Sequence, residues 1–138
     1  MEDFMDAVKT CLRKYKDFTG RASRREYWFF FLFSSVAAIV LGIVAAIIGV
    51  IAEFVIGLAS DEAGEIVGNF VGGLILFAGL LALFLPNIAA GARRLHDTNK
   101  SGWLLLLNFI PVGNIVVLVL LGLKGTDGPN RFGDEPEN

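Results

Sequence analysis

The sequence predicts an all-α integral membrane protein, and three observations carry that prediction. First, 54% of its 138 residues are apolar, only 19% are charged, and the mean hydropathy is +0.62, which is high for a soluble domain of this length. Second, no Asp, Glu, Lys, Arg or His occurs in Tyr27–Ala52, Ile66–Ala92 or Ser101–Leu123. Third, these runs are 26, 27 and 23 residues long, and each reaches the roughly 20 residues that a helix needs to cross about 30 Å of hydrocarbon.

The same composition excludes several classes of protein. A chain this apolar, with a net charge of −2, is neither a secreted or cytosolic globular enzyme nor a basic nucleic-acid-binding protein. Its single cysteine, Cys11, cannot form an internal disulfide, so a disulfide scaffold is excluded as well. We therefore expect a single membrane domain over residues 1–138.

The first element is predicted to be an amphipathic helix over residues 3–18. Phe4, Val8 and Cys11 recur at helical spacing, whereas Lys9 lies off this apolar stripe. A helix of this kind lies in the plane of the lipid headgroups and extends its basic side chains toward water. We interpret Cys11 as a packed apolar residue, with acylation as the alternative.

The first membrane span is expected over residues 24–56. Gly20 ends the preceding element, and Ser23 and Glu26 have the spacing of a capping box at a helix N-terminus. Trp28 follows, where aromatic rings favour the boundary between headgroups and hydrocarbon. An acidic loop over residues 59–65, without Lys or Arg, leads to the next span.

The second span is expected over residues 66–92. Its Gly68-x-x-x-Gly72 motif gives one side of the helix a smooth surface that allows close approach of a neighbouring helix. Pro86 predicts a kink or a loosened turn near the end of this span, because proline lacks the N–H that an α-helix requires.

The third span, over residues 101–123, is expected to begin at an N-cap on Ser101 and to be broken near Pro111. The tail over residues 124–138 is rich in Gly and Pro, so we expect it to be flexible.

The distribution of basic residues predicts the orientation. Of twelve Lys and Arg residues, seven precede the first span, none lies in the acidic loop, three follow the second span and two follow the third. The positive-inside rule then places the N-terminus in the cytoplasm. A complete third crossing, which 23 residues favour by length, would put the C-terminus outside, whereas a re-entrant third segment would keep all twelve basic residues inside.

Two polar clusters flank the spans on the predicted cytoplasmic side and form the candidate lipid- or partner-binding site. Its residues are Arg21, Arg24, Arg25, Trp28, Arg93, Arg94, His96, Asp97 and Trp103. The arginines have the chemistry to hold one anionic headgroup or a partner peptide. The alternative is that they only orient the spans, that Ser23 caps a helix and that Asp97 fixes the His96 ring through a loop hydrogen bond. With no second histidine in the chain, we predict no catalytic residue, no metal site and no cofactor.

Four motifs resemble one known family. They are Phe18-x-Gly20-Arg21-Ala22-Ser23-Arg24-Arg25-Glu26-x-Trp28, Arg93-Arg94-Leu95-His96-Asp97, Ser101-Gly102-Trp103 and Gly128-x-Asn130-Arg131-Phe132-Gly133. In their order, from about Phe4 to Pro136, the chain is similar to the bacterial inner-membrane proteins of domain-of-unknown-function family 805. The resemblance implies a small multi-pass protein of the bacterial cytoplasmic membrane, and it brings no established activity and no role for the motif residues.

Three functions are consistent with these features. We expect a non-enzymatic interaction or scaffold protein whose partners are the lipid bilayer, anionic phospholipid headgroups, and a second copy or another membrane protein, because three helices barely cover one another. The first alternative is a small transporter, channel or channel subunit that uses the broken helix around Pro111. The second is a lipid-headgroup enzyme using His96 and Asp97, although one loop offers few convergent polar groups for acid-base chemistry.

Overall fold

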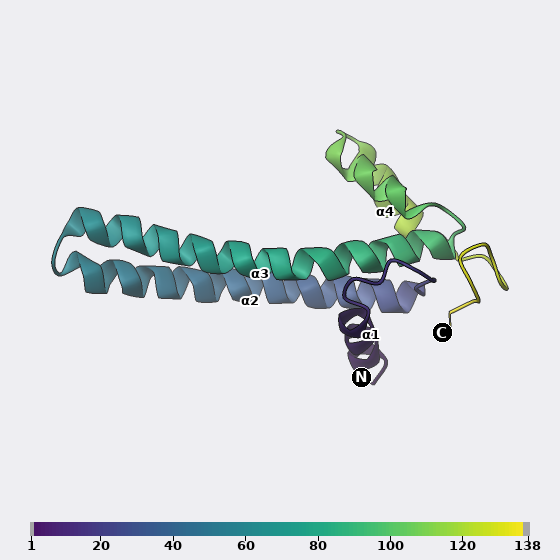
Figure 1. The fold of residues 1–138 in the computed structure, drawn as a ribbon, viewed down its shortest axis with the longest axis horizontal. Coiled ribbons are helices and arrows are strands. Elements are labelled where there is room, and N and C mark those ends of the chain that lie inside the picture. The colour runs from purple at the N-terminus through teal and green to yellow at the C-terminus, as the bar shows by residue number, and fades with distance from the viewer. Residues whose placement is uncertain (1, 137–138) are drawn as a thin grey trace. The chain divides into compact units, whose positions relative to one another are not determined.

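The computed structural model describes residues 2–136, and within that range it contains helices and no strand beyond an isolated bridge between Asn130 and Gly133. The elements, in chain order, are α1 (Glu2–Arg13), α2 (Arg24–Gly57), α3 (Asp61–Asp97), the 3₁₀-helix η1 (Gly102–Phe109) and α4 (Gly113–Gly122), as Figure 1 shows. The chain divides into two compact units. We call residues 1–33 and 85–138 the junction unit and residues 34–84 the hairpin unit.

Two helices, α2 and α3, are long and apolar enough to cross a membrane. They contain 34 and 37 residues and include the predicted spans 24–56 and 66–92. In the most apolar 18-residue stretch of each helix, only 11% of the residues of α2 and 6% of those of α3 are buried within the protein. A core helix of a soluble protein would bury most of such a surface, so these exposed apolar side chains are suited to lipid rather than water.

In the hairpin unit, α2 and α3 approach closely through glycines, as the Gly68-x-x-x-Gly72 motif predicted. A Cβ atom added to Gly68 would lie 2.7 Å from the carbonyl oxygen of Gly49, and one added to Gly72 would lie 3.0 Å from that of Ala45. A side chain larger than hydrogen at Gly68 therefore cannot be accommodated without moving a backbone. The neighbour that this smooth face meets is α2.

Residues 101–123 form a short helical hairpin instead of one continuous helix. Ser101 is the N-cap of η1, and its hydroxyl accepts a hydrogen bond from the amide of Trp103, as predicted. The break expected near Pro111 is present, but it reverses the chain, because Val112 adopts a left-handed conformation with φ of 70° before α4 begins. The structure thus shows no third helix of spanning length among residues 2–136.

The N-terminal helix is shorter than the predicted 3–18 and packs against protein. It ends at Arg13, and the carboxylate of Asp17 accepts hydrogen bonds from the amide and hydroxyl of Thr19 at 2.9 and 2.6 Å, which offers the backbone an alternative to the helix. Gly20 then turns the chain with φ of 76°. On α1 itself, Val8 and Cys11 from the predicted apolar stripe are buried in the junction unit.

Candidate functional site: the arginine cluster of the junction unit

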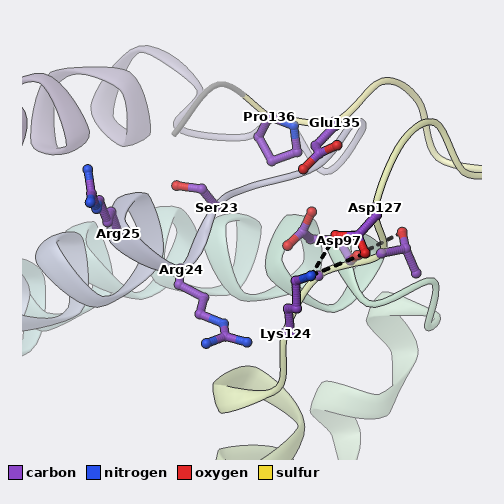
Figure 2. A pocket seen from close by; sticks show the side chains of 10 residues that line it. Ser23, Arg24, Arg25, Asp97, Lys124, Asp127, Glu135 and Pro136 are labelled. Atoms are coloured by element: carbon purple, nitrogen blue, oxygen red, sulfur yellow. Dashed lines mark hydrogen bonds and ion pairs between the residues drawn. The ribbon is translucent and has the colours of Figure 1, made fainter.

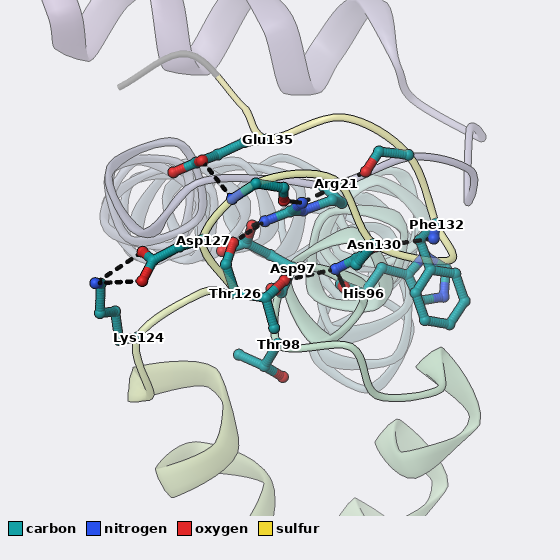
Figure 3. Close-up of polar contacts among 12 residues, drawn as sticks. Arg21, His96, Asp97, Thr98, Lys124, Thr126, Asp127, Asn130, Phe132 and Glu135 are labelled. Atoms are coloured by element: carbon teal, nitrogen blue, oxygen red, sulfur yellow. Dashed lines mark hydrogen bonds and ion pairs between the residues drawn. The ribbon is translucent and has the colours of Figure 1, made fainter.

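Asp97, the last residue of α3, is the centre of a buried ion-pair cluster (Figure 3). Its Oδ1 atom accepts from Nε of Arg21 at 3.0 Å, and its Oδ2 atom pairs with the guanidinium of Arg94. The side chains of Arg21, Arg94 and Asp97 are only 1%, 0% and 6% exposed. Two buried guanidinium groups therefore share one buried carboxylate, and their remaining N–H groups need other acceptors.

Backbone carbonyls at the end of α4 supply acceptors for Arg94. Its Nε donates to the carbonyl of Leu121 at 3.0 Å, and a terminal nitrogen donates to the carbonyl of Leu123. Leu121 lies in the last turn of α4 and Leu123 is its C-cap, where carbonyls have no partner within the helix. Because Ser101 lies four residues after the end of α3 and Leu123 returns to Arg94, the η1–α4 hairpin starts and finishes at the same end of α3.

The C-terminal tail supplies the acceptors for Arg21. Its two terminal nitrogens donate to the carbonyls of Gly128 and Thr126, both at 2.6 Å, and the amide of Thr126 donates to the carbonyl of Asp97 at 2.9 Å. Gly125 lies so close to Asp97 that an added Cβ would overlap the carboxylate. Residues 125–128 thus complete the cluster, although composition alone predicted only a flexible tail.

A second ion pair joins α3, α2 and α1. The guanidinium of Arg93, which is fully buried, donates to the carboxylate of Glu26 at 2.6 Å, and Cys11 lies beside both groups. Burial, together with the nearby Glu26 carboxylate, raises the pKa of Cys11 to about 12. The thiol is therefore protonated and unreactive at neutral pH, which favours the interpretation of Cys11 as a packed side chain.

Local capping at α2 explains how Glu26 becomes available to Arg93. The hydroxyl of Ser23 accepts from the amide of Glu26 at 3.2 Å, as the predicted capping box requires. The carboxylate of Glu26 points to Arg93 instead of back to the Ser23 amide. The sequence pattern therefore identified the helix start correctly, while the glutamate pairs across the fold.

His96 and Asp97 do not form a dyad. The Nδ1 atom of His96 lies 3.1 Å from the carbonyl oxygen of Gly20, and its ring stacks on Phe132 with centroids 3.9 Å apart and an interplanar angle of 4°. Asn130 donates to the backbone carbonyl of His96 at 3.0 Å. The alternative in which Asp97 orients the imidazole is wrong, because Asp97 pairs with arginines and the carbonyl of Gly20 orients the ring.

The remaining predicted site residues lie outside the buried cluster. Arg24 and Arg25 are exposed at the first turn of α2, Trp28 is half-buried against the apolar core, and Trp103 on η1 is 78% exposed. Nε of Arg24 donates to the carbonyl of Leu123 at 3.1 Å. Among residues 2–136, the side chain of Arg25 has no hydrogen bond or ion pair, and in Figure 2 it points away from Lys124.

Arg24, Arg25 and Lys124 line a pocket of about 290 Å³ beside the buried cluster (Figure 2). Lys124 pairs there with Asp127 at 2.8 Å, and this contact raises the pKa of the lysine and lowers that of the aspartate. The carboxylate of Glu135 lies on the same pocket and accepts from the amide of Gly128. The pocket therefore mixes both signs of charge.

We call Arg21, Arg94 and Asp97, together with the carbonyl groups that the two arginines bind, the arginine lock. Its arginines bind acceptors within the chain, and no group of three or more His, Cys, Asp or Glu residues able to hold a metal occurs among the described residues. The tail contacts were missed because turn-forming composition does not show which carbonyls a distant arginine uses. The signal in the sequence that the tail makes specific contacts was the Gly128-x-Asn130-Arg131-Phe132-Gly133 motif.

Comparison with known proteins identifies the family. Residues 15–134 match the family described as "Protein of unknown function (DUF805)". The chain is 40% identical over 127 residues to the Inner membrane protein YhaI of Escherichia coli, covering 91% of each chain. It is 37% identical over 134 residues to the Inner membrane protein YhaH of the same organism, covering 96% of this chain and 98% of that relative. No solved structure matches. This membrane protein, with its two long apolar helices, belongs to the DUF805 family.

Proposed function

We propose that this protein is a non-enzymatic interaction protein of the bacterial inner membrane that binds anionic phospholipid headgroups at Arg24 and Arg25. The location is supported by two relatives that are named inner membrane proteins. The observation that carries the binding site is the division of the arginines. Arg21, Arg93 and Arg94 are buried and paired within the chain, so among the arginines of the two predicted clusters Arg24 and Arg25 are the ones exposed to lipid.

Our proposed topology has two crossings, α2 and α3, with the N-terminus in the cytoplasm and the η1–α4 hairpin re-entering from that side. Eight 3₁₀ residues rise about 16 Å and ten α-helical residues about 15 Å, roughly half of a 30 Å hydrocarbon layer. The tail contacts with Arg21 and Asp97 favour a cytoplasmic C-terminus. All twelve basic residues would then lie inside.

A reporter that fluoresces only in the cytoplasm, fused after Asn138, tests this topology. We expect fluorescence from the full-length fusion and none when the same reporter is inserted into the acidic loop after Ser60. A dark C-terminal fusion that is stably inserted would restore the complete third crossing.

Lipid binding is tested by native mass spectrometry of the detergent-purified protein with phosphatidylglycerol. Each basic residue near a membrane surface contributes about 1 kcal/mol, so the double variant Arg24→Gln, Arg25→Gln should retain about ten- to thirtyfold less of this lipid. The matched control is Lys14→Gln, Lys16→Gln, which removes the same charge from two exposed residues after α1. Equal losses in both variants would contradict a site on α2.

A further inference from the structure

We propose that an apolar pocket beside η1 binds one acyl chain of phosphatidylethanolamine, with the ammonium headgroup donating to His96. The pocket has a volume of about 480 Å³, within the usual size of small-ligand sites. Its walls are apolar side chains from α3, η1 and the segments before α2 and after α4, chiefly Phe18, Ile88, Leu106, Phe109 and Phe132. This site is separate from the exposed Arg24 and Arg25 pair.

The polar end of the pocket is His96, and its hydrogen-bonding character is fixed by Gly20. A carbonyl oxygen can only accept, so Nδ1 of His96 carries the proton in the contact with Gly20. In the neutral ring, Nε2 is therefore an acceptor. It faces Gly102, because a Cβ added there would lie 3.3 Å from Nε2. Among residues 2–136, Nε2 has no hydrogen-bond donor.

The His96 ring is held in this orientation by its contact with Gly20 and by stacking on Phe132. One face stacks on Phe132, and the guanidinium carbon of Arg131 lies 4.7 Å from the centre of the Phe132 ring. Gly102 is required for the approach of η1 to α3, since an added Cβ would lie only 2.9 Å from the side chain of Ala92. A preoriented acceptor at the end of an apolar pocket matches a ligand with an apolar tail and a hydrogen-bond donor at its head.

The position of the pocket identifies the source of that tail. Trp103 and Phe109, two of its lining residues, are each 78% exposed, and the pocket lies at the polar end of α3, a helix of membrane-spanning length. Its opening is therefore continuous with the lipid-exposed surface, where an acyl chain can enter without crossing water. An ammonium headgroup carries three N–H donors, one of which satisfies Nε2.

Native mass spectrometry with two lipids that differ only at the ammonium tests this site. Phosphatidylcholine has the same chains and phosphate but no N–H donor. We expect wild-type protein to retain phosphatidylethanolamine about tenfold or more over phosphatidylcholine, the size of one hydrogen bond to a charged group. The His96→Asn variant can still donate to Gly20, but its shorter amide places no acceptor at the position of Nε2, and it should lose this preference. Equal retention of the two lipids by the wild type overturns the proposal.

A second variant tests the pocket without changing His96. Leu106→Trp fills the pocket and should reduce retention of phosphatidylethanolamine at least tenfold. Leu118→Trp is the matched control, since Leu118 on α4 is also 55% exposed but does not line the pocket. The Arg24→Gln, Arg25→Gln variant should keep the phosphatidylethanolamine preference, so failure of this site and failure of the anionic site are separately visible. Full retention by Leu106→Trp would exclude the pocket as the acyl-chain site.

Discussion

The two compact units of this chain are each stabilised internally by a different kind of contact. The junction unit contains all twelve basic and ten of the fourteen acidic residues, whereas the hairpin unit contains four acidic residues and no basic one. The first is closed by buried guanidinium groups that bind carboxylates and carbonyls. The second is closed by glycines that bring two backbones together. Charged side chains thus stabilise the junction unit, where the chain supplies acceptors for them. In the hairpin unit, where lipid surrounds the helices, small residues stabilise the helix contact instead.

Removing the shared carboxylate should break the junction unit and give the largest loss of stability. In Asp97→Asn, the guanidinium groups of Arg21 and Arg94 stay buried without a counter-charge, which costs about 3–5 kcal/mol. Thermal unfolding in detergent, followed by circular dichroism, measures the loss. The control is Asp127→Asn, whose pair with Lys124 is 79% and 74% exposed, and we expect no measurable change there. Equal destabilisation by the two variants would argue against the lock.

Cys11 offers a chemical reporter of the junction unit. Because its pKa is raised to about 12 by burial and Glu26, the thiolate is on the order of a thousandfold rarer at neutral pH than for an ordinary exposed thiol. We expect N-ethylmaleimide, followed by mass spectrometry, to label the folded protein at least about a hundredfold more slowly than the denatured one. The folded state holds the proton, so its stability should also fall as the pH rises from 9 toward 12.

The same reporter separates the two units. Asp97→Asn opens the unit that buries Cys11 and should accelerate labelling, whereas a variant that disturbs only the hairpin unit should leave the rate unchanged. If a variant in the hairpin unit that is destabilised as much as Asp97→Asn also accelerates the labelling of Cys11, the two units unfold together. The comparison between them then fails.

The Gly68→Ala variant, which adds a methyl group, should push α2 and α3 apart and destabilise the hairpin unit. Its Cβ would lie 2.6 Å from the Cβ of Glu53 and 2.7 Å from the Gly49 carbonyl, and overpacking of this kind costs about 1–3 kcal/mol. Gly73→Ala is the matched control, because nothing lies within 4 Å of an added Cβ there. Helix propensity predicts that this control is stabilising by up to about 1 kcal/mol. Thermal unfolding of both variants in one detergent measures the difference, and similar midpoints would contradict glycine-mediated packing.

The sequence predicted the hairpin unit more completely than the junction unit. Length and hydropathy located two long helices, and Gly68-x-x-x-Gly72 indicated their contact face, because these signals are local. The direction of an arginine side chain is not local. Arg93 and Arg94 follow an apolar span in the same way whether they meet headgroups or the protein interior, and their acceptors come from residues up to 67 positions away along the chain.

Part of the lock was nevertheless visible in the sequence. Asp97 follows Arg94 by three residues, a spacing at which side chains on one helix can pair. The hairpin over residues 101–123 was harder to predict, because 23 apolar residues fit one crossing by length. The left-handed conformation of Val112, directly after Pro111, is what distinguishes the reversal from a kinked helix.

Val112 gives the smallest predicted effect and tests that reversal directly. Its φ of 70° lies in the left-handed region, where a β-branched residue is strained by about 1–2 kcal/mol. Glycine relieves this strain but gains entropy in the unfolded chain, so Val112→Gly should stabilise the protein by no more than about 1 kcal/mol. Val119→Gly, at a similarly exposed position inside α4, should instead destabilise it by about 0.5 kcal/mol. Opposite signs in thermal unfolding would show that residue 112 is a turn, whereas equal losses would place it inside a continuous helix and return the third segment to a full crossing.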